Sequence, residues 1–248
     1  MIMKYLLLIC CIGLFSCGDE EVLNVFIENQ PNINKDFTPK IKYSTVSISG
    51  LIKNGEGLSV VLESPLMSNK IKLDSTTIDK DDKFNFELSI PEDYGYYILR
   101  LLNNERDSIE LSLKGGDKIS LNTTSKKFNS YPQLKGFRWC QDANQFQKKK
   151  SLINDNSKEL SILATRFMKK NPTSPYNIIL SKYFIGSEVD INEFKIDVFH
   201  NVTRAFIDSF PNSLATKNFI DQLDILVDVR SKTLGLSKGD YMLNNGFY

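Results

Sequence analysis

Short runs of strand-forming residues recur about every ten residues between Tyr43 and Asn122, and this spacing constrains the fold more than any other feature. In Lys83–Ile90 the apolar residues fall on every second position, which is typical of a strand with one buried face. Seven such runs are expected as strands: Thr45–Ile52, Leu58–Glu63, Lys70–Ile78, Lys83–Ile90, Tyr96–Leu102, Ser108–Leu113 and Lys118–Asn122. They predict an antiparallel β-sandwich or barrel-like domain over residues 41–135.

Turn-forming residues separate these runs and support the assignment. Asn54–Gly57 supplies residues that accept positive φ, Asp79–Asp82 is a polar hairpin tip, and Lys114–Asp117 is a glycine turn.

Beyond Gly136 the apolar residues recur at spacings of three, four and seven, which is typical of helices. We therefore expect a small bundle of four or five helices over residues 136–232, with a glycine-punctuated tail over residues 233–248. The expected helix boundaries are a break at Asn154–Ser157, a cap at Ser174 before Pro175, a stop at Gly186, a capping box from Asp190 to Glu193, and a cap at Ser213. The predicted fold class is α+β.

The N-terminal residues 1–16 have the pattern of a secretory signal, with Lys4 ahead of the apolar run Tyr5–Phe15. A helix of that length spans about 16 Å, roughly half of the hydrocarbon core of a bilayer, so a cleaved leader is favoured over a membrane span.

The sequence Leu14–Cys17 resembles the lipobox of bacterial lipoproteins, which implies that Cys17 is lipidated, palmitate included, and holds the chain on a membrane. The alternative is an ordinary cleaved signal that carries cysteines. The acidic segment Gly18–Glu21 resembles an export signal of Bacteroidetes lipoproteins, or is a solvated linker. Residues 17–40 are expected as a lipidated tether of an outer-membrane lipoprotein, on either its periplasmic face or the cell surface.

Charge and motif content exclude several functions. Lys and Arg number 31 against 30 Asp and Glu, so the strongly basic balance of a nucleic-acid-binding protein is missing. With one His, and one thiol left after leader removal, the sequence offers no Cys/His metal site. Phosphate-binding glycine loops and a Gly-x-Ser-x-Gly elbow are also missing. We therefore predict no metal, no cofactor and no nucleic-acid partner.

Two candidate sites remain. Cys140 is expected as the single thiol of the mature chain, and its place at a helix start is compatible with a reactive thiol of lowered pKa or with a buried structural cysteine. Tyr94, Tyr96 and Tyr97 surround a glycine and form either an aromatic ligand platform or part of the sheet core. His200 is expected as a partly buried or surface imidazole in a helix.

The order of these parts resembles a known family. The segments Leu73–Thr76, Asp82–Phe86 and Gly116–Leu121 resemble the uncharacterised N-terminal domain of Bacteroidetes thioredoxin-like lipoproteins of the TlpA and AhpC/TSA type. Phe167–Ser174 and Ser209–Ser213 resemble the helix junctions of that family's linker bundle. One departure is Asp82, which stands where the family usually places Gly.

Gly239–Leu243 resembles the lead-in to the family's thioredoxin domain, whose Cys-x-x-Cys motif does not occur in this sequence. A single thiol cannot complete a dithiol/disulfide cycle, so the resemblance implies a non-catalytic binding or assembly module, with a separate thioredoxin-like or other envelope protein as its partner. The alternatives are a participant in thiol-disulfide exchange through Cys140, or a truncated oxidoreductase.

Overall fold

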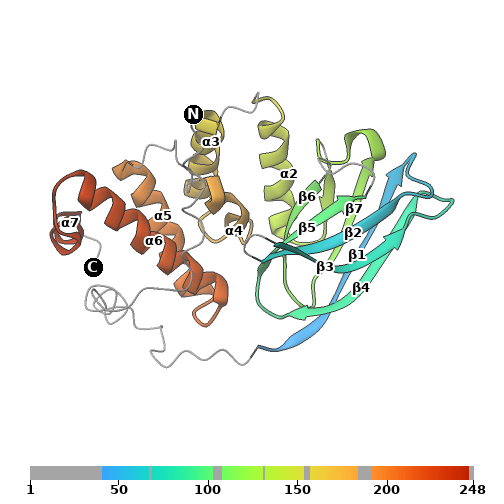
Figure 1. The fold of residues 1–248 in the computed structure, drawn as a ribbon, viewed down its shortest axis with the longest axis horizontal. Coiled ribbons are helices and arrows are strands. Elements are labelled where there is room, and N and C mark those ends of the chain that lie inside the picture. The colour runs from blue at the N-terminus through green and yellow to red at the C-terminus, as the bar shows by residue number, and fades with distance from the viewer. Residues whose placement is uncertain are drawn as a thin grey trace, which may run out of the picture.

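The strands and the helices form two ends of one elongated molecule. The computed structural model describes residues 41–66, 69–102, 108–130, 132–153, 157–183 and 192–245. Within these residues eight strands come first and six helices follow, with α7 farthest from the strands (Figure 1). The expected leader and tether, and the expected boundary residues Gly186 and Asp190, lie outside the described residues.

The eight strands form two four-stranded sheets, which confirms the α+β class and favours the sandwich over a closed barrel. Their bounds are β1 Tyr43–Lys53, β2 Ser59–Leu66, β3 Asn69–Thr77, β4 Lys83–Pro91, β5 Gly95–Leu101, β6 Ser108–Leu113, β7 Lys118–Thr124 and β8 Gln133–Lys135. One sheet has the order β4-β1-β7-β8 and the other has the order β3-β2-β5-β6.

The core of the sandwich consists of the apolar residues that alternate along each strand. From the first sheet these include Val46, Ile48, Phe84, Phe86 and Ile119, and from the second they include Val60, Leu62, Leu99, Ile109 and Leu111. Gly50 makes room for this packing, because a Cβ there would lie 2.5 Å from a ring carbon of Phe84 and 2.6 Å from the backbone oxygen of Leu121.

Two features of the sheets were not predicted. β1 pairs with β7 in parallel, with Ser47 beside Lys118, because the chain crosses from one sheet to the other at the turn after β6. The short strand β8 pairs with β7, and three residues are too few to show a period in the sequence.

The six helices include the expected bundle and one helix beyond it. Their bounds are α2 Arg138–Lys150, α3 Ser157–Lys170, α4 Asn177–Leu180, α5 Glu193–Ser209, α6 Leu214–Thr233 and α7 Lys238–Asn245. Short 3-10 turns lie at Ser125–Lys127 and Ser181–Tyr183.

Helix capping follows the sequence at α6 and departs from it at α4 and α5. Ser213 caps α6 as expected, with its hydroxyl accepting from the Thr216 N–H at 2.9 Å. The cap of α5 is Asn192, not Asp190, because the Asn192 carboxamide accepts from the Lys195 N–H. Ser174 caps no helix: α4 begins at Asn177, and the Ser174 hydroxyl donates to Asp142 on α2 at 2.6 Å.

The C-terminal segment is a helix and not the expected tail. Gly235 has a φ of 68° and ends α6, with its N–H and that of Leu236 donating back to the carbonyls of Lys232 and Ser231. Ser237 then starts α7 by accepting from the Asp240 N–H at 3.1 Å. A Gly followed by a Ser cap therefore marks a sharp turn between two helices here.

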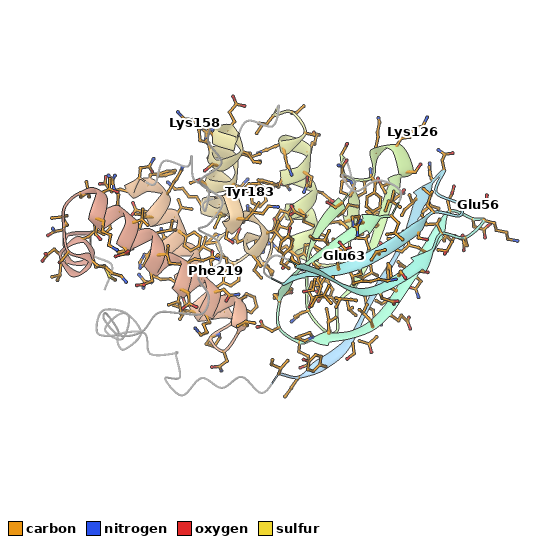
Figure 2. The ribbon with its side chains drawn as sticks, viewed as in Figure 1. Glu56, Glu63, Lys126, Lys158, Tyr183 and Phe219 are labelled. Carbon is orange, nitrogen blue, oxygen red and sulfur yellow. The ribbon has the colours of Figure 1, made fainter. Side chains whose placement is uncertain are left out.

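The turn at Asp82 places an aspartate in a backbone conformation that favours glycine. Asp82 has a φ of 62°, a conformation that favours Gly, and its carboxylate accepts from the N–H groups of Asn54, Gly55 and Glu56 at 3.2, 2.9 and 3.2 Å. These bonds hold together the two turns at the far end of the β domain, where Figure 2 labels Glu56. The hydrogen bonds, that from Gly55 first, lower the pKa of Asp82.

We expect Asp82→Ala to lower the melting temperature by several degrees, because three backbone donors lose their acceptor and a side chain that tolerates positive φ is lost. Circular dichroism measures the effect. Asp81→Ala is the matched control and should leave the melting temperature unchanged, because the neighbouring Asp81 is exposed. Equal stability of the two variants would contradict this account of the turn.

Candidate functional site

The helices cover the outer face of the second sheet at β5 and β6. Tyr97, Leu99 and Leu101 of β5 face the sandwich core, while Ile98 on the opposite face is also buried. α4 contacts both strands, and the hydroxyl of Ser112 on β6 donates to the carbonyl of Pro175 just before α4 at 2.9 Å. β5 is therefore a strand buried on both faces at the boundary between strands and helices.

A cluster of charged and aromatic side chains lies at this boundary, and we call it the junction cluster: Tyr96, Glu110, Lys182 and Tyr183. Glu110 on β6 accepts from the Tyr96 hydroxyl and forms an ion pair with Lys182. The Lys182 ammonium lies 5.7 Å from the centre of the Tyr96 ring and 4.9 Å from that of Tyr183. Figure 2 labels Tyr183 on the helical side of the boundary and Glu63 on the strand side.

Burial shifts the pKa values of Lys182, Tyr96 and Tyr183. It lowers the pKa of Lys182, and the charge of Glu110 opposes that effect. Burial, followed by the charge of Glu110, raises the pKa of Tyr96 and of Tyr183 above the ordinary tyrosine value. Both phenols therefore stay protonated at neutral pH, and Tyr96 remains a hydrogen-bond donor to Glu110.

A second contact joins α6 to the turn between β4 and β5. The carboxylate of Asp93 accepts from the N–H of Leu214, the first residue of α6, where a negative charge stabilises the helix. Beside it the Tyr94 ring packs edge-on against Phe210, with ring centres 5.7 Å apart. Burial is the main cause that raises the pKa of Asp93.

The structure separates the three tyrosines of the candidate ligand platform. Tyr97 is buried in the sandwich core, and Tyr96 belongs to the junction cluster. Tyr94 packs against Phe210, and the centre of its ring lies 5.1 Å from the Lys114 ammonium. Burial raises the pKa values of Tyr94 and Tyr97 to about 12. These side chains serve three different contacts and do not present one shared surface.

Cys140 lies in the first turn of α2 and is fully buried. A helix start favours the thiolate, but burial outweighs it and raises the pKa of Cys140 to about 11. The thiol is therefore protonated at neutral pH and closed to solvent. No other cysteine lies among the residues that the structure describes.

Asp117 lies near Cys140 and Tyr94, whose pKa values its charge helps to raise. One carboxylate oxygen accepts from the Lys114 N–H at 3.1 Å, and within the described part of the chain the other has no hydrogen-bond partner. Burial raises the pKa of Asp117 to about 6. This acid therefore titrates close to physiological pH.

The remaining candidate groups give no chemical centre in the part of the chain that the structure covers. His200 on α5 is buried, and burial followed by the charge of Arg204 lowers its pKa to about 4. Across the described ranges no three His, Cys, Asp or Glu side chains are grouped to hold a metal ion. No described helix is long and apolar enough to cross a membrane. Cys17 lies outside the described residues.

Sequence patterns alone do not identify the residues that make these contacts. Glu110 lies in the expected strand Ser108–Leu113, and no motif marks Glu110, Lys182 or Asp93 as a site residue. One signal was present: Tyr96–Leu99 is a continuous apolar run, and such a run is typical of a strand covered on both faces. A strand of this kind requires a helix layer on its outer face.

The family model described as Domain of unknown function (DUF4369) matches residues 46–138, from β1 to the first residue of α2. The chain therefore contains a DUF4369 domain, and that domain is the two-sheet unit with the start of its covering helix. A comparison with curated proteins gives no match.

We expect the Glu110–Lys182 pair to contribute to stability across the boundary. A double-mutant cycle of Glu110→Gln and Lys182→Met, measured by urea denaturation, should give a coupling free energy of about 1 kcal/mol, because Glu110 is largely buried and charged. The control is the more exposed pair Lys217 and Asp221 within α6, for which we expect about 0.3 kcal/mol. A coupling no larger than the control would contradict a role in holding the helices on the sheet.

Asp117 should make stability depend on pH. Its pKa is about 6 in the folded protein against an ordinary 3.8, so the folded state binds the proton more tightly. The free energy of unfolding therefore falls as pH rises from about 4 to about 6, by up to about 3 kcal/mol. Asp117→Asn should flatten this dependence in urea denaturation, and the exposed Asp81→Asn should not. If the free energy of unfolding of the Asp117→Asn variant depended on pH as in the wild type, the pKa of Asp117 would not be raised in the folded protein.

Proposed function

We propose that this chain is a lipid-anchored envelope protein in which the DUF4369 domain and the helices act together as a non-catalytic binding or assembly module. Lipidation at Cys17 would place it at the outer membrane. In this proposal it is related to the accessory region of Bacteroidetes thioredoxin-like lipoproteins, and its partner is a separate thioredoxin-like protein of the envelope.

The observation that carries this proposal is the use of the charged residues at the boundary. Glu110 is engaged by both Tyr96 and Lys182, and Asp93 is engaged by the start of α6. Glu110 and Asp93 thus each bond to a residue of the helical part, and these bonds hold strands and helices together. Buried apolar residues also form one continuous cluster from the sandwich into the helices. A rigid body of this kind is suited to presenting a surface to a partner.

Exposed apolar side chains at the helical end support a partner surface there. Ile225 and Val229 lie one turn apart on α6 and are 58% and 42% exposed, and Leu243 on α7 is 63% exposed. This end of the molecule lies opposite the β domain (Figure 1). Adjacent exposed apolar residues such as Ile225 and Val229 are a feature of protein interaction sites. The resemblance of Gly239–Leu243 to the segment that leads into a thioredoxin domain favours such a protein as the occupant.

Capture of a thioredoxin-like envelope protein by the full chain tests the proposal. We expect wild-type protein to retain it, and Ile225→Glu with Val229→Glu to reduce retention about tenfold or more, because charge in an apolar contact is costly. Leu152→Glu is the matched control, since Leu152 is also exposed but follows α2. Retention that is absent, or equal in all three proteins, would contradict the proposal.

Thiol chemistry separates the proposal from the redox alternative. In the folded chain we expect Cys140 to react with a thiol reagent at least about a hundredfold more slowly than in denaturant, because it is buried and protonated. The same preparation should not reduce insulin. Rapid labelling of Cys140 in the folded chain, or insulin reduction above the blank, would favour thiol-disulfide exchange instead.

A further inference from the structure

The two sheets have four edge strands, and two of them are blunted against pairing with another chain. β8 has only three residues. β3 carries a bulge where the register with β2 shifts between Leu62 and Glu63. On that strand the Asp74 carboxylate also accepts from the Ser75 N–H at 2.7 Å. The edge strand β4 has no such interruption, because its register with β1 runs without a shift from Lys83 to Pro91.

The hydrogen bonding of β4 shows which backbone groups face outward. The N–H of Ile52 donates to the carbonyl of Asp82 at 2.8 Å, so the pair Ile52 and Asp82 is hydrogen-bonded. Hydrogen-bonded pairs alternate along an antiparallel ladder, and the even-numbered residues of β4 therefore bond to β1. The backbone groups of Lys83, Asn85, Glu87 and Ser89 point away from β1. Those of Lys83 bond to Asp79 in the hairpin turn, which leaves Asn85, Glu87 and Ser89 as the outward ladder.

The side chains of these odd-numbered residues are exposed on the solvent face of the sheet, and the even-numbered Phe84, Phe86 and Ile90 are buried on the core face. A second strand added at this edge would thus continue both faces of the sheet. Its core face would be apolar and its outer face polar.

We infer that β4 is a self-pairing edge, at which a second copy of this chain adds its own β4 in antiparallel orientation with the two Phe86 residues opposite each other. This inference is independent of the proposed function. In this register Asn85 lies opposite Glu87 of the second copy, and the two positions exchange backbone hydrogen bonds. The symmetry of the pair repeats the same bonds on the other side.

The charges on the outer face are complementary in this register. Lys83 lies diagonally across from Glu87 of the second copy, within reach of a long side chain, and the Asn85 carboxamide can donate to the same Glu87 carboxylate. Moving the register by one residue in each strand, so that Glu87 lies opposite Glu87, would bring like charges together. The charges of Lys83 and Glu87 therefore disfavour the register in which Glu87 lies opposite Glu87.

The core face supports the same register. Phe84 lies opposite Leu88 of the second copy, and Leu88 is only partly buried within its own chain. The added strand covers the part of the Leu88 side chain that is still exposed. Few residues of each copy form the contact, so the dimer is expected to be weak and to depend on concentration.

Sedimentation velocity of the full chain in detergent over a range of concentrations tests the inference. We expect a monomer–dimer equilibrium for the wild type. Glu87→Lys should raise the dimer dissociation constant about tenfold or more, because the introduced ammonium then faces Lys83 of the second copy. Lys83→Glu combined with Glu87→Lys exchanges the charges and should restore the dissociation constant to within about threefold of wild type.

Two further variants keep the test independent of folding. Asn85→Pro removes an outward N–H but no bond to β1, and it should abolish the dimer while the far-ultraviolet spectrum stays unchanged. Lys72→Glu on the β3 edge is the charge control and should leave the dimer intact. A wild type that stays monomeric, a charge exchange that fails to restore pairing in folded protein, or a dimer that survives Asn85→Pro would overturn the inference.

Discussion

The burial of β5 on both faces is the constraint on which the rest of the structure depends. Its core-facing residues pack inside the sandwich, and Ile98 on the other face is covered by the helical layer. A strand with apolar side chains on both faces is stable only if both faces are shielded from water. The helices therefore supply the cover on the outer face of β5, and the two parts form a continuous core.

The polar groups at this boundary have a structural explanation. Asp93 stabilises the start of α6, and Glu110 joins a tyrosine of the sheet to a lysine that follows α4. Asp117 and Cys140 are buried close to the same boundary and have raised pKa values. Glu110 and Asp93 thus serve the joining of the two layers, which is the physical basis for proposing a binding function over a catalytic one.

The sequence predicted those features that depend on local pattern. Alternating apolar residues identified seven strands, and Ser213 identified the start of α6, because period and capping are properties of adjacent residues. The parallel pairing of β1 with β7 depends on where the chain crosses between the sheets, which no local pattern encodes. The junction cluster joins Glu110 to Lys182, which are 72 positions apart, so only the folded chain brings the site together.

The central claim is that strands and helices form one cooperative unit held at β5. Hydrogen exchange of backbone amides, measured at increasing denaturant, tests this most directly by comparing β1 with α5, which lie on opposite sides of the boundary. The account predicts that the most protected amides of both elements exchange through one shared unfolding reaction with the same free energy and the same dependence on denaturant. Exchange of α5 through a separate opening of lower free energy, with β1 still protected, would contradict it.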